Sequence, residues 1–189
     1  MTPRPFGIAS RPLGMWLFVV SDALTFSTLL ICYTYLRIGN PDWPTPFGWS
    51  SILQASLMTL VLVTSSLTMA LGVKAMRDGS RPNAARYLFA TAACGVTFIV
   101  LHANEWLHLI REEKLTISAS LFGATFFTLT GLHMAHVAIG VIYLSAVALR
   151  VNGGGLNADD VETSGLYWHF VDLVWMFIFP LVYLMSVKL

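Results

Sequence analysis

Five long apolar segments dominate the sequence and restrict what the chain can fold into. A membrane-crossing helix needs roughly 20 mostly apolar residues, and five segments are long enough: about 13–36, 52–75, 87–107, 118–149 and 166–187. A bilayer offers no water to backbone polar groups, so such segments cross it as helices, whose hydrogen bonds are internal. We therefore predict an all-α integral membrane protein, a five-transmembrane-helix bundle that forms a single membrane domain over residues 1–189.

The composition supports a membrane protein and argues against several other classes. Apolar residues make up 56% of the chain and charged residues 11%, whereas soluble domains carry about 25% charged residues. The formal net charge of +1 gives no basic surface for nucleic acid. Cys32 and Cys94 both lie inside apolar runs, too few for a disulfide framework. The first apolar run is longer than a signal-peptide core, so we expect a permanent span.

Basic residues predict the orientation of the bundle. Cytoplasmic connections carry an excess of Lys and Arg. The N-terminal side holds Arg4, Arg11, Lys74, Arg77, Arg81, Arg86 and Arg150, and the opposite side holds Arg37, Arg111, Lys114 and Lys188. We therefore predict a cytoplasmic N-terminus.

Acids and histidines inside the spans are the candidate functional residues. At the bilayer centre an ionisable side chain costs about 2.5–3.5 kcal/mol on insertion scales, so it faces protein or water. Seven such residues occur: Asp22, His102, Glu105, His133, His136, His169 and Asp172. Helical projection at about 100° per residue places several of them on shared faces. One face of the third helix carries Thr91, Gly95, Phe98, His102 and Glu105. One face of the fifth carries Trp168, His169, Asp172 and Trp175, with Val171, Val174 and Ile178 on the other side.

Three roles are open for these residues. They can fasten neighbouring helices together, they can conduct protons or hold lipid, or they can bind a metal. His133 and His136 share a face, but two histidines alone are weak grounds for a metal site, and the sequence does not have the two Glu-x-x-His motifs that di-iron bundles pair. We favour buried polar residues with a structural or proton-related role, with no catalytic residue, no metal ligand and no cofactor in this chain.

Several motifs resemble one family of membrane subunits. The run from Tyr167 to Trp175, YWHFVDLVW, resembles the closing helix of heme–copper oxidase subunit III. Residues 130–137, TGLHMAHV, are similar to that family's Thr-Gly-x-His-x-x-His-Val motif. Further matches, in the family's order, are Phe98, His102, Glu105 and Trp106, the run Gly14 to Phe18 followed by Ser21 and Asp22, and Leu62, Ser65, Ser66 and Thr68. The resemblance covers nearly the whole chain and is to the short five-helix form.

Some positions depart from the family pattern. Asp22 stands where the family usually has Glu, His102 where it has Gln, Trp106 where it has Tyr, and Met134 where it often has Gly. Asp22 and the closing run Phe179 to Tyr183 are similar to the branch associated with nitric oxide reductase. The resemblance leaves the partner enzyme open between these two branches.

The resemblance implies a non-catalytic subunit III of a bacterial terminal oxidase in the cytoplasmic membrane. Such a subunit supports the stability, lipid binding and sustained proton uptake of the catalytic subunit in aerobic respiration. Haem and copper are then expected in that partner, with subunit I, subunit II and membrane phospholipids as the partners of this chain. The alternatives are an accessory protein of nitric oxide reductase and a membrane metalloenzyme that uses His102, His133, His136 and His169.

Overall fold

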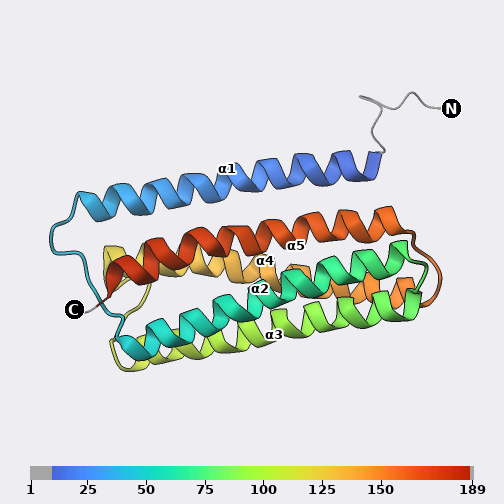
Figure 1. The fold of residues 1–189 in the computed structure, drawn as a ribbon. Coiled ribbons are helices and arrows are strands. Elements are labelled where there is room, and N and C mark those ends of the chain that lie inside the picture. Colours follow the sequence, from blue (N-terminus) through green and yellow to red (C-terminus); the bar gives the residue numbers. More distant parts are fainter. Residues whose placement is uncertain (1–9, 188–189) are drawn as a thin grey trace.

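The structure, a computed structural model, describes residues 10–187 and consists of five long helices that run side by side (Figure 1). They are α1 (Ser10–Ile38), α2 (Trp49–Arg77), α3 (Arg81–Arg111), α4 (Leu121–Asn152) and α5 (Ala158–Ile178). Each is long and apolar enough to cross a membrane, the last together with its continuation to Ser186. The described residues contain no β-strand beyond an isolated bridge between Phe47 and Val187. The predicted all-α bundle of five transmembrane helices is confirmed, whereas Arg4 and Lys188 of the charge count lie outside the described residues.

The helices extend further than the apolar segments indicate. Helix α5 begins at Ala158 rather than near residue 166, because a capping box stabilises its first turn: the Asn157 side chain accepts from Asp160 N (3.1 Å), and Asp160 accepts from Asn157 N (3.2 Å). Helix α3 begins at Arg81 rather than near 87, with a proline in its first turn. An apolar window marks the hydrocarbon layer alone, and both helices continue into the headgroup region.

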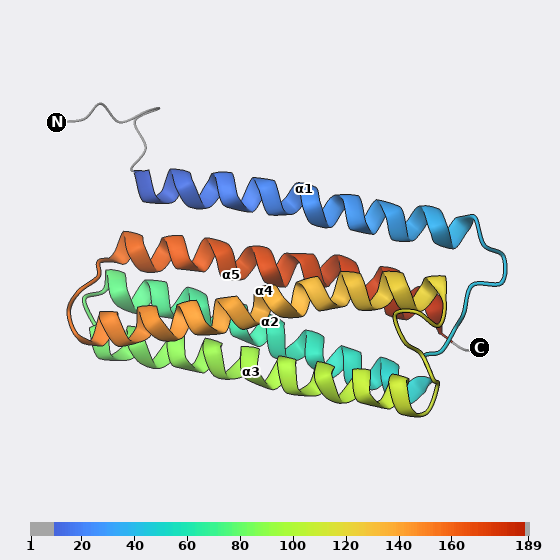
Figure 2. The same cartoon turned by 180° about the vertical axis from the view of Figure 1, so that it is seen from behind.

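Helices α2 to α5 form a four-helix bundle, and α1 lies along one side of it (Figures 1 and 2). Within the bundle α2 and α4 each contact both α3 and α5, and α1 contacts α5 and α4. In the most apolar window of α1 6% of the residues are buried, against 50% for α5. Helix α5 is therefore the central helix, and its apolar side, with Val171, Val174 and Ile178, is as buried as the side that carries Trp168.

Trp168 fills the space between α5 and two other helices. Its side chain is fully buried. A Cβ added at Gly95 of α3 would lie 2.6 Å from the Trp168 ring, and one added at Gly140 of α4 would lie 2.8 Å from it. Glycine at these two positions therefore permits the close approach of three helices around one large side chain.

We expect Gly140→Ala to destabilise the bundle by about 1–3 kcal/mol, because the added methyl group overpacks the Trp168 ring. The matched control is Gly14→Ala in α1, where an added Cβ has no neighbour within 4 Å. The control should be neutral or gain roughly 0.5–1 kcal/mol from the higher helix propensity of alanine. The free energy of unfolding in mixed detergent micelles measures both, and equal effects would contradict the packing role of Gly140.

Candidate functional site

The seven polar residues separate into three groups instead of one site. His102, Glu105 and His133 lie in the core, Asp22 pairs with His136 between α1 and α4, and His169 lies with Asp172 beside α2. Six of them are buried or partly buried, and the His169 side chain is exposed on the surface of α5. Their structural or proton-related role stays a prediction. Within residues 10–187 no three His, Cys, Asp or Glu side chains are placed to hold one metal ion.

Two histidines of the core group share an aromatic cage. His102 of α3 stacks on Phe98 with ring centroids 5.5 Å apart, and His133 of α4 stacks on Trp175 of α5 at 5.4 Å. Each imidazole also makes an edge-on contact with the aromatic ring on which the other histidine stacks. The centroid distance is 5.6 Å from His102 to Trp175 and 5.6 Å from His133 to Phe98. Both histidines are fully buried. The third-helix face that projection predicted, from Thr91 to Glu105, is buried throughout.

Glu105 connects this cage to the end of the bundle where α3 ends and α4 begins. Its Oε2 accepts a 2.7 Å hydrogen bond from the Tyr183 hydroxyl, which comes from a π-helical turn at Phe179–Tyr183, and lies 4.0 Å from His102 Nδ1. Glu105 also lines a hollow of about 390 Å³ together with Ser50, Gln54 and Asn104. Among the described residues, 10–187, the ring nitrogens of His102 and His133 and Glu105 Oε1 have no hydrogen-bond partner. Buried polar atoms of this kind can bind small polar species such as water.

The Asp22–His136 pair joins α1 to the bundle and holds a proton. His136 Nε2 lies 3.0 Å from Asp22 Oδ2, and its Nδ1 lies 2.8 Å from the Leu132 carbonyl oxygen. A carbonyl oxygen only accepts, so Nδ1 carries a hydrogen. A second proton lies between Nε2 and Oδ2, because two bare acceptors at this distance would repel each other. With that proton on either atom the pair as a whole is neutral, which suits its depth in the membrane.

The third group fastens α5 to α2. Ser66 of α2 donates to Asp172 Oδ2 through a short hydrogen bond and lies 3.0 Å from His169 Nδ1. The Trp168 indole donates to Ser65 Oγ at 2.8 Å, and Ser65 donates to the Leu62 carbonyl at 2.6 Å. The adjacent residues Ser65 and Ser66 thus form hydrogen bonds with two neighbouring turns of α5. The sequence placed these serines in helix packing but did not link them to Asp172.

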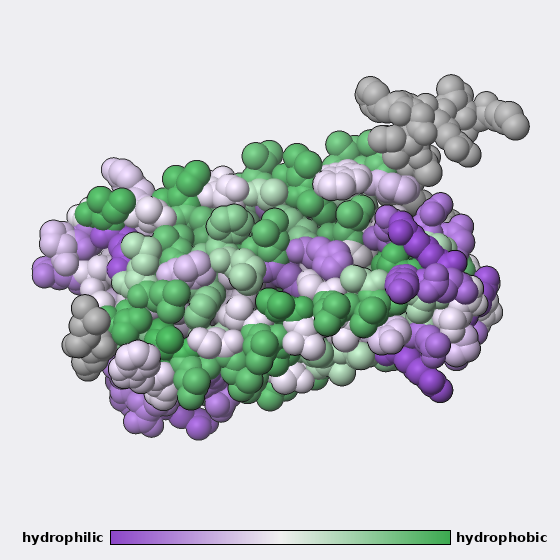
Figure 3. Space-filling model, viewed as in Figure 1, coloured by the Kyte–Doolittle hydropathy of each residue, from purple (hydrophilic) through white to green (hydrophobic). Residues whose placement is uncertain are grey.

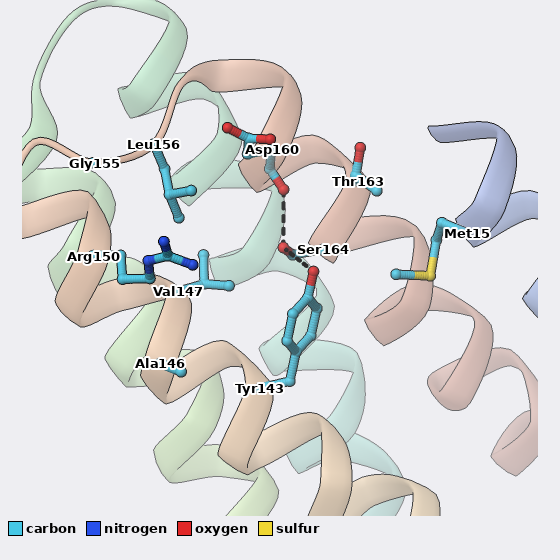
Figure 4. Close-up of a pocket in the computed structure, with 10 residues that line it drawn as sticks. All are labelled: Met15, Tyr143, Ala146, Val147, Arg150, Gly155, Leu156, Asp160, Thr163 and Ser164. Carbon is cyan, nitrogen blue, oxygen red and sulfur yellow. Dashed lines mark hydrogen bonds between the residues drawn. The ribbon is translucent and has the colours of Figure 1, made fainter. Parts of the chain in front are cut away.

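A hollow at the N-terminal side of the bundle was missed by sequence reasoning. It has a volume of about 550 Å³ and lies where the beginnings of α1 and α5 meet the end of α4 (Figure 4). Arg150 and Tyr143 extend into it from α4, with Met15 on the α1 side. Ser164 Oγ lies 3.1 Å from the Tyr143 hydroxyl and 2.9 Å from the Asp160 carbonyl oxygen. The sequence signal was an arginine in the last turn of a span, which was counted for orientation alone.

The chain is similar to known membrane proteins over most of its length. The family model described as cytochrome c oxidase subunit III matches residues 8–187. Cytochrome c oxidase subunit 3 of Bacillus subtilis is 36% identical over 92% of this chain and 86% of its own length. The protein of the same name from Alkalihalophilus pseudofirmus is 35% identical over 93% of this chain and 86% of its own. Quinol oxidase subunit 3 of Bacillus subtilis is 33% identical over 92% and 86%.

We expect the Asp22–His136 contact to appear as a coupling free energy in a double-mutant cycle. Asp22→Leu and His136→Leu should each destabilise the chain, and the double variant should lose less than the sum by roughly 0.5–2 kcal/mol, the range of polar contacts between membrane helices. Thr28→Val is the control, since the Thr28 hydroxyl bonds to the Leu24 carbonyl of its own helix. Additive losses in detergent-micelle unfolding would show that the pair does not fasten α1.

Proposed function

Because this chain belongs to the cytochrome c oxidase subunit III family, we propose that it supports the stability and the sustained proton uptake of a catalytic subunit and binds phospholipid. It is an accessory subunit III of a bacterial heme–copper oxidase. The observation that carries this conclusion is the match of one family model to residues 8–187, which include all five membrane-spanning helices.

The alternatives have less support. The relatives named above are oxidase subunits and lend no support to an accessory protein of nitric oxide reductase. The metalloenzyme hypothesis required His102, His133, His136 and His169 to act together. The structure divides them instead among an aromatic cage, a pair with Asp22 and a pair with Ser66. Haem and copper belong to the catalytic subunit in this proposal.

The polar residues are proposed to fasten the helices and, in two groups, to hold protons. The Asp22–His136 pair supports a proton-related role because one proton lies between the two side chains. The core group supports it because Glu105 joins a hollow at the outer end to His102. The contacts of Asp172 with α2 support a structural role. The partners in this proposal are subunit I, which carries the catalytic site, and subunit II, in the bacterial cytoplasmic membrane with the N-terminus on the inner side.

The hollow around Arg150 is proposed to bind the headgroup of a phospholipid. It lies at the end of the spans, where headgroups are found, and combines a guanidinium with the hydroxyl groups of Tyr143 and Thr163. Met15, Val147 and Leu156 add apolar contacts suited to the start of an acyl chain. A guanidinium matches phosphate geometry with two parallel hydrogen bonds.

We expect a complex from which this chain has been removed to keep most of its initial activity and all of its haem. Its activity should then decay faster during turnover, because the catalytic subunit loses proton supply and packing. Oxygen consumption over time and the visible spectrum of the complex, with and without the chain, measure both effects. Loss of the haem spectrum on removal would contradict an accessory role.

Arg150→Gln should lower the amount of anionic phospholipid that copurifies with the complex by about fivefold, because one basic side chain near a membrane surface is worth about 1 kcal/mol. Arg86→Gln is the matched control, an exposed arginine of α3 outside the lining of the hollow. Quantitative lipid extraction with mass spectrometry measures the ratio. Equal losses in the two variants would remove the case for a headgroup site at Arg150.

A further inference from the structure

His169 is placed differently from the other six polar residues. It is exposed, yet it lies seven residues along α5 from Glu162, or roughly 10 Å deeper at 1.5 Å per residue. Its partner Ser66 lies eight residues along α2 from Lys74, roughly 12 Å deeper. Glu162 and Arg77 form an ion pair of 2.6 Å on the polar rim of the bundle. The imidazole is therefore at hydrocarbon depth on the outer surface.

The hydrogen bonds of His169 determine whether its outward nitrogen, Nε2, is a donor or an acceptor. Ser66 has one hydroxyl hydrogen and donates it to Asp172 Oδ2. His169 Nδ1 must then donate to Ser66 Oγ across 3.0 Å, which leaves Nε2 of the neutral ring as an acceptor. Lipid chains offer no hydrogen-bond donor, so a polar side chain at this depth is expected to face protein. An acceptor at this depth therefore calls for an N–H or O–H donor that lipid chains do not supply.

The surface around His169 has the form of a groove between α2 and α5. A hollow of about 400 Å³ runs from the rim residues Lys74, Arg77 and Glu162 to His169. The exposed Ala70 lines it, and a small residue of this kind lets a second helix approach closely, whereas Gly165 is buried against Met69 of α2. Beyond His169 the exposed side chains are apolar, among them Leu173 and Phe177. Figure 3 shows hydrophilic side chains that interrupt the apolar surface in the middle of this face.

We propose that a transmembrane helix of the catalytic subunit docks along this α2–α5 groove and donates a hydrogen bond to His169 Nε2. The inference rests on the proposed function, which supplies a membrane-embedded partner. The groove runs from Glu162 to His169, and the exposed apolar side chains beyond it extend the face to Phe177. This face is fifteen residues or roughly 22 Å long, most of the hydrocarbon thickness that a partner helix crosses. A small exposed residue at the inner end, an acceptor in the middle and apolar side chains further out suit one helix along the whole length.

A photo-crosslinking residue at Leu173 tests which molecule occupies the groove. The same residue at Ile142, an exposed position of α4, is the control. In membranes that contain the whole oxidase, Leu173 should crosslink to the catalytic subunit at least about fivefold more than Ile142 does. A crosslink from Leu173 to lipid alone or to a second copy of this chain would overturn the proposal, as would equal crosslinking from both positions.

A second experiment follows the hydrogen bond itself. In complexes purified by a tag on the catalytic subunit, His169→Leu should lower retention of this chain in detergent about three- to tenfold, the effect of one net hydrogen bond. His169→Gln keeps an acceptor oxygen near the position of Nε2 and should restore most of the retention. Thermal unfolding of the isolated variants separates lost docking from lost folding. Equal retention in His169→Leu and the native complex would overturn the role of His169.

The two levels of inference fail in different ways. If the native chain does not copurify with a haem-containing catalytic subunit, the proposed function fails. If it copurifies but Leu173 does not crosslink to that subunit, the function stands and the α2–α5 groove is not the docking surface.

Discussion

The absence of hydrogen-bonding solvent in the hydrocarbon layer is the constraint on which this structure depends. Apolar contact distinguishes poorly between a helix neighbour and lipid, so helix position must come from close packing and from polar side chains that find each other. Each polar group accordingly joins different helices: Asp22 reaches α4 through His136, and Ser66 reaches α5 through Asp172. Within the core, Tyr183 reaches Glu105 of α3 from the turn that follows α5. The polar residues thus determine which helices are neighbours, which apolar contacts alone would not do.

The fold was predictable because length and hydropathy suffice to identify membrane spans. How the polar residues group within the bundle was less predictable from the sequence. Projection placed Phe98, His102 and Glu105 on one face of α3, and that face is buried where α3 packs against α2 and α4. It was of less use for α5, because a central helix is buried on several sides and periodicity cannot tell a second protein neighbour from lipid. For His169 the sequence indicated a polar residue that faces protein, whereas the structure leaves its side chain exposed on the surface of α5.

The structure shows which contacts are made by two residues that depart from the family pattern, Asp22 and His102. Asp22 is one methylene shorter than the Glu usual at this position, and still comes within 3.0 Å of His136 Nε2. His102, which replaces Gln, stacks on Phe98, and its ring nitrogens have no hydrogen-bond partner among residues 10–187. This imidazole lies next to a carboxyl group already engaged by Tyr183.

The position of α5 explains how one small subunit can serve two different neighbours. Around its first turns Asp160, Thr163 and Ser164 line the hollow shared with α1 and α4, while Glu162, Gly165, Leu166 and His169 line the groove shared with α2. Steps of three and four residues keep each set on its own side of the helix. The phospholipid proposed at Arg150 and the partner helix proposed at His169 would therefore occupy different surfaces and would not compete. Both surfaces belong to one helix, which is held to α2 through Asp172 and lies close to α3 and α4 around the Trp168 ring.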